Sequence, residues 1–177
     1  MLGPVAAALV VTACATATPY QPLGTRGASG GFTEQRIEAN RYRVAFVGND
    51  YTSRQRVENY LLYRAAELTL ANGYDGFTMV RRDTDRNVDT RVTGGYGPGP
   101  YPYWRPYWRY RGYYGWRYWD PWYGDPFWAD RVDVRTVVSY EANAEIVMFR
   151  GTRPGDPMSF DARQVIANLR PTIVVPR

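Results

Sequence analysis

The chain has 177 residues, a formal net charge of +5 and a pI of about 9.4, and all 22 of its basic residues are arginine. It contains no histidine, which excludes His-based triads, proton relays and the usual zinc sites. The length suits one domain rather than two. The arginine excess would suit anionic lipid headgroups or acidic glycans, and a codon bias toward arginine explains it equally well.

The N-terminal segment ends in the pattern of a bacterial lipobox. Residues 5–11 form an apolar run, Thr12 and Ala13 are small, and Cys14, the single cysteine, follows them. A secretory signal needs an apolar core that enters the membrane and small residues at the cleavage site. We therefore expect residues 1–13 to be a lipoprotein signal peptide and Cys14 to be lipidated. The alternative is a buried structural cysteine.

Two details of this segment concern the translation start of the protein and the membrane in which it is anchored. Its first four residues carry no positive charge and it is short for a signal peptide, so the true translation start is open. Ala15 follows the cysteine, whereas an aspartate there would indicate retention at the inner membrane. We therefore expect a lipid anchor in the outer membrane, facing the periplasm, with inner-membrane anchoring as the alternative. Acyl chains anchor a small domain because each buried methylene contributes about 0.8 kcal/mol.

Residues 14–31 are rich in Ala, Thr, Gly, Ser and Pro and show no apolar period, so we expect a flexible tether there. A single domain is then expected over residues 32–177. It opens with a strand over residues 33–37 and a second strand over residues 41–48, in which apolar and polar residues alternate. Period-two alternation is typical of a half-buried strand, and the two strands together predict a hairpin.

The longest element predicted is a helix over residues 53–72. Thr52 or Ser53 is the candidate N-cap, and Thr52 with Gln55 fits a capping box. Asn72 and the glycine after it predict the C-terminal stop. The apolar stripe consists of Val57, Leu61, Ala65 and Leu68.

The elements after this helix complete the predicted sheet. Residues 76–82 predict a strand that returns beside the first one in a β-α-β passage. Residues 130–150 predict a second hairpin with a turn at 141–143. A short helix is expected over residues 160–169, capped by Ser159 or Asp161.

An aromatic segment over residues 93–128 separates the two halves of the domain. It holds all six tryptophans and nine of the sixteen tyrosines, interleaved with Gly, Pro and Arg. Gly and Pro at this density forbid a helix and interrupt a sheet. The fold class predicted is therefore α+β: a mixed, mostly antiparallel sheet with one long and one short helix on one face, interrupted by a disordered aromatic/Gly/Pro insertion.

Three binding roles compete with a merely mobile insertion. The aromatic rings can stack on the sugars of peptidoglycan or another envelope glycan, lie at a membrane–water interface, or dock a protein partner. Single-stranded nucleic acid also suits such residues, but a secreted lipoprotein would seldom meet it, so no nucleic-acid partner is expected. The candidate contact residues are Trp104, Trp108, Trp116, Trp119, Trp122 and Trp128.

Carboxylates are the only acid–base candidates for catalysis. Asp83, Asp85 and Asp89 follow a predicted strand, and Asp130 and Asp133 begin the next. Paired carboxylates can hydrolyse glycosides, but neighbouring arginines are more typical of a solvated surface. No nucleophile–base motif and no Gly-rich phosphate loop is present. We therefore expect neither an enzyme nor a cofactor or metal site.

Two motifs carry a resemblance to a known family. NRYRVAFVGN at residues 40–49 and YLLYRAAELTLANGYD at residues 60–75 resemble a family of small alphaproteobacterial lipoproteins of Caulobacter type. The resemblance runs from Cys14 to about Arg82, skips the insertion and continues more loosely toward the C-terminus. It implies a lipid-anchored envelope protein of unknown function, with Cys14 as the lipid site and no catalytic residues. The sequence thus favours a non-enzymatic structural or interaction role, with peptidoglycan binding through the insertion as the alternative.

Overall fold

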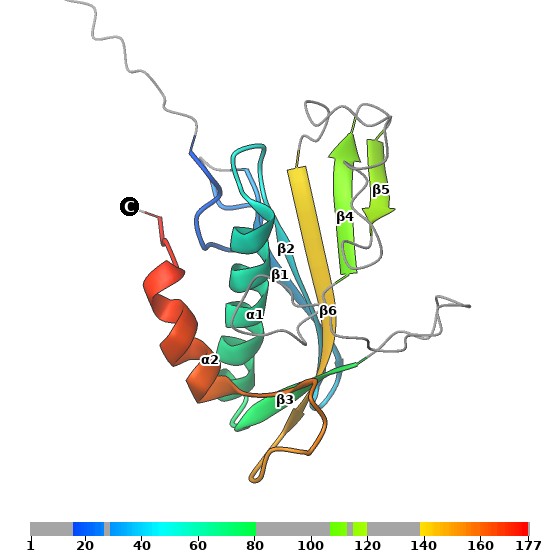
Figure 1. Cartoon of the computed structure of the whole chain (residues 1–177), viewed down its shortest axis with the longest axis vertical. Helices are drawn as coiled ribbons and strands as arrows, with labels where there is room; N and C mark the ends of the chain where they lie inside the picture. Colours follow the sequence, from blue (N-terminus) through cyan, green and yellow to red (C-terminus); the bar gives the residue numbers. More distant parts are fainter. Residues whose placement is uncertain (1–15, 27–28, 81–106, 113–114, 120–138, 177) are drawn as a thin grey trace, which may run out of the picture.

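The computed structural model of the chain describes residues 16–26, 29–80, 107–112, 115–119 and 139–176. In these residues seven strands form one antiparallel sheet, and two helices lie on one of its faces (Figure 1). The strands are β1 (Gly31–Glu38), β2 (Arg41–Val47), β3 (Gly76–Val80), β4 (Tyr107–Gly112), β5 (Gly115–Trp119), β6 (Ser139–Phe149) and β7 (Ser159–Asp161), and the helices are α1 (Arg54–Ala71) and α2 (Ala162–Leu169). The predicted α+β class, with a mostly antiparallel sheet and helices on one face, is confirmed.

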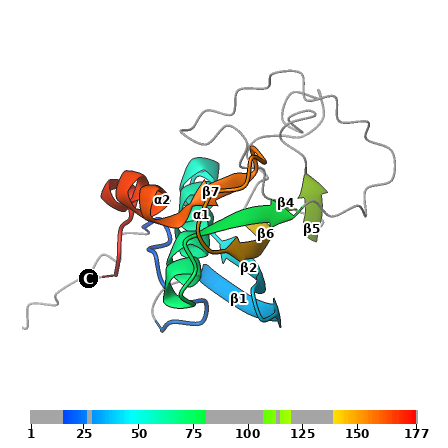
Figure 2. The same ribbon diagram turned by 90° about the horizontal axis from the view of Figure 1, so that it is seen from below.

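The sheet is built around β6. β2 pairs along one edge of β6, and β1 extends the sheet beyond β2 as the expected hairpin. β3 and β4 share the other edge of β6, where β7 pairs with β3 and β5 pairs with β4. Seen from below, α2, α1 and the sheet follow one another as layers (Figure 2).

Two expectations about this sheet are wrong. β3 does not lie beside the first strands, because β6 lies between β2 and β3. β2 and β3 are both antiparallel to β6, so they are parallel to each other. With α1 they form the expected β-α-β passage, but β6 lies between the two strands. The expected turn at residues 141–143 is also absent from β6, which is continuous. Glu141 and Asn143 look like turn residues in the sequence, but they alternate with the buried Ala142 and Ala144 in a strand.

Helix α1 follows its predicted boundaries closely. Its N-cap is Ser53, whose hydroxyl accepts the amide hydrogen of Arg56 at 3.3 Å. Thr52 is buried instead of capping, so the capping box with Gln55 is not formed. Gly73 has a φ of +75°, the left-handed conformation that ends a helix, as the sequence predicted.

The core lies between α1 and the sheet. Tyr42, Val44 and Phe46 of β2 are buried, and they share one apolar cluster with residues of α1, β3 and β6. Asp161 is the N-cap of helix α2, as predicted, and accepts the amide hydrogen of Gln164 at 2.9 Å. The helix packs against α1, and its buried residues are Ala162, Val165 and Leu169. The largest fully buried side chains are Trp108, Tyr60, Phe46, Phe77, Leu61, Leu62, Ile146, Met148, Leu169, Val44 and Val57.

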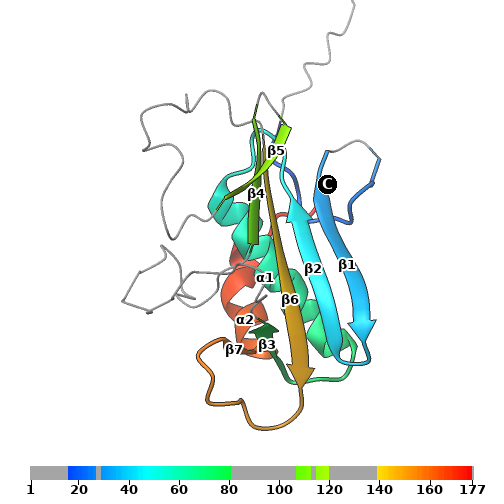
Figure 3. The same ribbon diagram turned by 90° about the vertical axis from the view of Figure 1, so that its right-hand side faces the viewer.

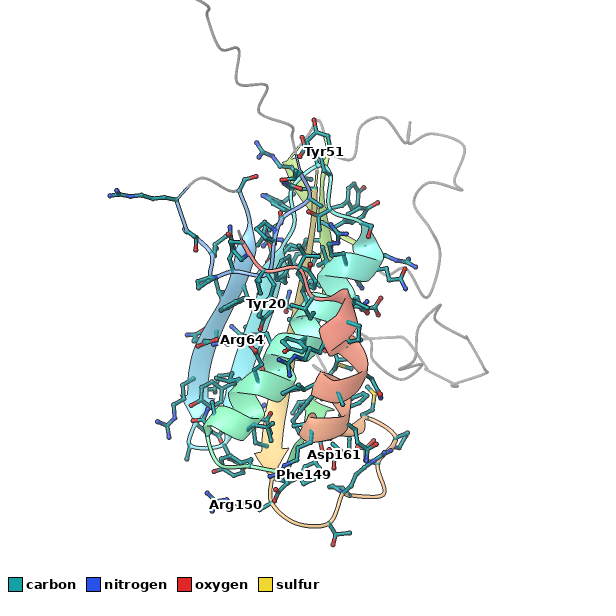
Figure 4. All side chains as sticks on the ribbon, turned by 90° about the vertical axis from the view of Figure 1, so that its left-hand side faces the viewer. Tyr20, Tyr51, Arg64, Phe149, Arg150 and Asp161 are labelled. Carbon is teal, nitrogen blue, oxygen red and sulfur yellow. The ribbon has the colours of Figure 1, made fainter. Side chains whose placement is uncertain are left out.

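The expectation of a flexible tether over residues 14–31 is wrong for residues 16–26, which we call the N-terminal strap. Thr18 and Tyr20 of this strap are buried. The Tyr20 ring lies against α1 (Figure 4), within 5.5 Å of the Tyr60 and Tyr63 ring centres in edge-to-face contacts. Its hydroxyl donates a hydrogen bond to Glu67. The strap is thus folded because its polar side chains have partners, although its composition is that of a linker.

Candidate functional site

Part of the aromatic insertion is an ordered hairpin. β4 and β5 pair with each other, and β4 pairs with β6 from Tyr107 opposite Asn143 to Arg111 opposite Ser139. The expectation of disorder over residues 93–128 is therefore wrong for β4 and β5. The rest of that segment lies outside the described residues. β4 forms a strand because its side chains have a period of two: Trp108 and Tyr110 lie on one face, and Arg109 and Arg111 lie on the other.

Trp108 lies on the face of the hairpin that turns toward the helices. Only 2% of its surface is exposed, and its ring meets Tyr140 edge-to-face with 6.2 Å between ring centres. In the sheet it lies opposite Ala142, whose small side chain leaves room for the indole. The prediction that Trp108 contacts a ligand is therefore wrong, because this residue belongs to the core.

The opposite face of the hairpin carries exposed aromatic rings around one arginine. Trp116 is 40% exposed and Tyr118 is 81% exposed. The guanidinium carbon of Arg109 lies 4.9 Å from the Trp116 ring centre and 6.0 Å from the Tyr118 ring centre. Arg109 also forms an ion pair with Glu141, with 3.2 Å between Nη2 and Oε2. We call Arg109, Trp116, Tyr118 and Glu141 the hairpin patch.

This patch is on the open face of the sheet, which the two helices do not cover (Figure 3). Glu141 lies directly opposite Arg109 in the register of β4 and β6. The ion pair holds the guanidinium beside Glu141, and the contacts with two rings add about 0.5–1 kcal/mol each at an exposed site. The patch therefore presents two rings and a positive charge in a defined arrangement.

A second group of charges continues the open face along β6. Glu145 is buried between two arginines of β2. Arg41 Nε donates to Glu145 Oε1 at 2.6 Å, and Arg43 Nη2 lies 3.7 Å from Oε2. The hydrogen bond with Glu145 raises the pKa of the Arg41 guanidinium. Glu141 and Glu145 are both engaged with arginines, so they are poor candidates for acid–base chemistry.

The open face of β2, β4 and β6 carries more positive than negative charge among the described residues. Its arginines are Arg41, Arg43, Arg109 and Arg111, and its carboxylates are Glu141 and Glu145. This balance, with the adjacent rings, suits an anionic or ring-shaped partner.

Among the predicted contact residues whose side chains the structure describes, Trp116 lies in the hairpin patch and Trp108 lies in the core. Trp119 lies at the end of β5, with its backbone opposite Trp108. Tyr118 and Arg109 were not among the predicted contact residues. The signal that could have found them is their equal distance of three residues from Gly115 and Gly112, which places them opposite each other in the hairpin. Trp104, Trp122, Trp128, Cys14, Asp83, Asp85, Asp89, Asp130 and Asp133 lie outside the described residues.

Three further findings concern metal binding, membrane-spanning helices and similarity to known proteins. Within the described ranges, no three His, Cys, Asp or Glu residues gather as a metal-binding group. No helix in this part of the chain has the length and apolarity needed to cross a membrane. No protein-family model, curated protein sequence or solved structure matches the chain.

Proposed function

We propose that this chain is a lipid-anchored envelope lipoprotein with a non-enzymatic structural or interaction role. Cys14 holds it in the outer membrane, facing the periplasm. The apolar run, the small residues and the lone cysteine at residues 5–14 support the anchor. The observation that carries the interaction role is the hairpin patch, with two exposed aromatic rings held around an arginine on the sheet face opposite the helices.

A protein partner is the occupant of the patch that we favour. Trp, Tyr and Arg are the residues most enriched at the energetic centres of protein interfaces. Arg109 is already oriented by Glu141 and by the Trp116 ring, so binding freezes few of its rotamers.

Peptidoglycan is the second candidate. The Tyr118 ring is almost fully accessible, and the face of an aromatic ring can stack on a sugar. The surplus of arginine on the same sheet face complements the carboxylates of peptidoglycan stem peptides.

Metabolic labelling tests the anchor. Cells that express the full chain are grown with a clickable fatty acid, and the protein is compared with its Cys14→Ala variant. We expect label on the wild type and none on the variant. Unlabelled wild type would refute the lipoprotein assignment.

Site-specific crosslinking tests the patch. A photo-crosslinking amino acid replaces Tyr118, and a matched control replaces Arg153, which is exposed in the loop between β6 and β7. We expect a discrete adduct from position 118, absent from position 153 and reduced when Arg109→Ala is added. Co-sedimentation with purified sacculi that disappears in Trp116→Ala would instead identify the glycan. If neither readout depends on the patch, the interaction role is wrong.

A further inference from the structure

The N-terminal strap is fixed to one end of the domain. The side-chain amide of Asn49 donates to the carbonyl of Thr16 at 2.8 Å. The amide of Thr18 donates to Thr52 Oγ1 at 2.8 Å, and the amide of Asn49 donates to Thr18 Oγ1 at the same distance. These bonds attach the strap to the loop between β2 and α1, which we call the β2–α1 loop (residues 48–53).

The attachment is built into the fold rather than a surface contact. The Thr18 hydroxyl also donates to the carbonyl of Ser29 at 2.8 Å. A Cβ at Gly30 would collide with the Thr18 side chain and the carbonyl of Val47, so the strap, the start of β1 and the end of β2 fit closely together. Release of the strap would leave buried polar groups without hydrogen-bond partners, and each such group costs about 1–3 kcal/mol of free energy.

This attachment limits the distance between Cys14 and the domain. Only Ala15 separates Cys14 from Thr16, and two Cα–Cα steps span at most about 7.6 Å. A flexible tether over residues 14–31 would instead have a root-mean-square span of roughly 23 Å. An anchor on Cys14 therefore keeps the β2–α1 loop within about 1–2 nm of the lipid surface.

We propose that the domain stands end-on on the bilayer, with the β2–α1 loop at the level of the lipid headgroups. This inference rests on the proposed lipidation of Cys14. Tyr51 in this loop is 63% exposed, and tyrosine is a residue type that prefers the membrane–water interface. Figure 4 shows Tyr51 at one end of the domain and Arg150 at the other.

The sheet separates these two ends. Val47 lies opposite Glu141 near the membrane end of β6, and Gly76 lies opposite Phe149 at the far end. Eight residue steps along β6 span roughly 26 Å. Because Glu141 belongs to the hairpin patch, a partner that occupies this patch must approach it from the side, close to the lipid surface.

Depth-dependent fluorescence quenching tests the orientation. A lipidated Cys14 has no free thiol, so Tyr51→Cys and Arg153→Cys each provide one labelling site on the full-length lipidated protein. Each variant carries a thiol-reactive fluorophore in vesicles of phosphatidylethanolamine and phosphatidylglycerol that contain a headgroup spin-labelled lipid. We expect several-fold stronger quenching at position 51 than at position 153.

A tether variant provides the matched control. Insertion of a Gly/Ser linker of about 20 residues between Ala15 and Thr16 frees the domain from the surface. Quenching at position 51 should then fall to the level at position 153. Equal quenching at both positions without the linker overturns the end-on orientation while leaving the anchor intact. Absence of fatty-acid label on wild-type protein overturns the anchor and this orientation together.

Discussion

Val80 and Tyr107 are neighbours along one edge of β6, although residues 81–106 lie between them in the sequence. Val80 lies opposite Glu145 and Tyr107 lies opposite Asn143, so a single position, opposite Ala144, separates them. β3 and β4 run in the same direction because both are antiparallel to β6. β3 and β4 therefore lie in the line of one strand, with room for one residue between Val80 and Tyr107.

The first prediction is that residues 81–106 can be replaced by one threonine without loss of the fold. The replacement joins β3 to β4 as a continuous strand. Bringing together the ends of a chain segment of this length costs roughly 3 kcal/mol of entropy, so the variant should be at least as stable as the wild type. Urea unfolding followed by far-UV circular dichroism measures the free energy and shows whether the transition stays cooperative.

A two-residue replacement is the control for this deletion. One linking residue keeps the alternation that places Trp108 on the helix side, whereas two residues reverse it or force a bulge. The two-residue variant should therefore be clearly less stable. The shared strand line is wrong if both variants unfold alike or if the one-residue variant loses its cooperative transition.

Two tryptophans of the hairpin should differ sharply in their contribution to stability. Trp108→Ala removes a buried ring and should lower the free energy of unfolding by about 3–5 kcal/mol. Trp116→Ala removes a half-exposed ring stacked on Arg109 and should cost less than about 1 kcal/mol. Urea titrations of the two variants measure this difference. Similar losses would contradict the assigned faces of β4 and β5.

The elements that could be predicted are those whose pattern is local. The helix over residues 54–71 and the first hairpin repeat their apolar residues often enough to fix the period. The face of Trp108 could not be predicted, because it depends on the register with Ala142, which lies far away in sequence. The order of the strap depends on Thr18 meeting Thr52, 34 residues later, and composition carries no signal for such a contact. For the candidate site, the sequence indicated a surface of aromatic residues and arginine. It did not indicate which face of the sheet each side chain occupies.

Glu58 should make the domain less stable at neutral pH than in mild acid. Burial raises the pKa of its carboxyl to about 7 from an ordinary value of 4.5, and Arg54 offsets only part of this effect. Between these two pH values the folded state holds a proton that the unfolded state has lost. The stabilisation is thus complete below about pH 4.5 and is lost as the pH rises through 7.

The Glu58→Gln variant should therefore gain stability relative to the wild type as the pH rises, by on the order of 2 kcal/mol at about pH 8. Urea unfolding at about pH 4 and pH 8 measures this change. Glu38→Gln is the control, because the Glu38 side chain is 60% exposed. Parallel stability profiles for wild type and Glu58→Gln would refute the shift.

The strap should depend on the hydroxyl of Thr18. In Thr18→Val the side chain keeps its shape, but the Asn49 amide loses its acceptor and the Ser29 carbonyl loses its donor. We expect a loss of about 2–3 kcal/mol in the free energy of unfolding and faster hydrogen exchange at the Tyr20 amide, which otherwise donates to the carbonyl of Val174 at 2.7 Å. Thr25→Val is the matched control, because the Thr25 hydroxyl bonds only to the nearby Pro22 carbonyl at an exposed site. If both variants exchange alike at Tyr20, the hydroxyl of Thr18 does not hold the strap, and its attachment rests on the bonds of Asn49 to Thr16 and of Thr52 to the Thr18 amide.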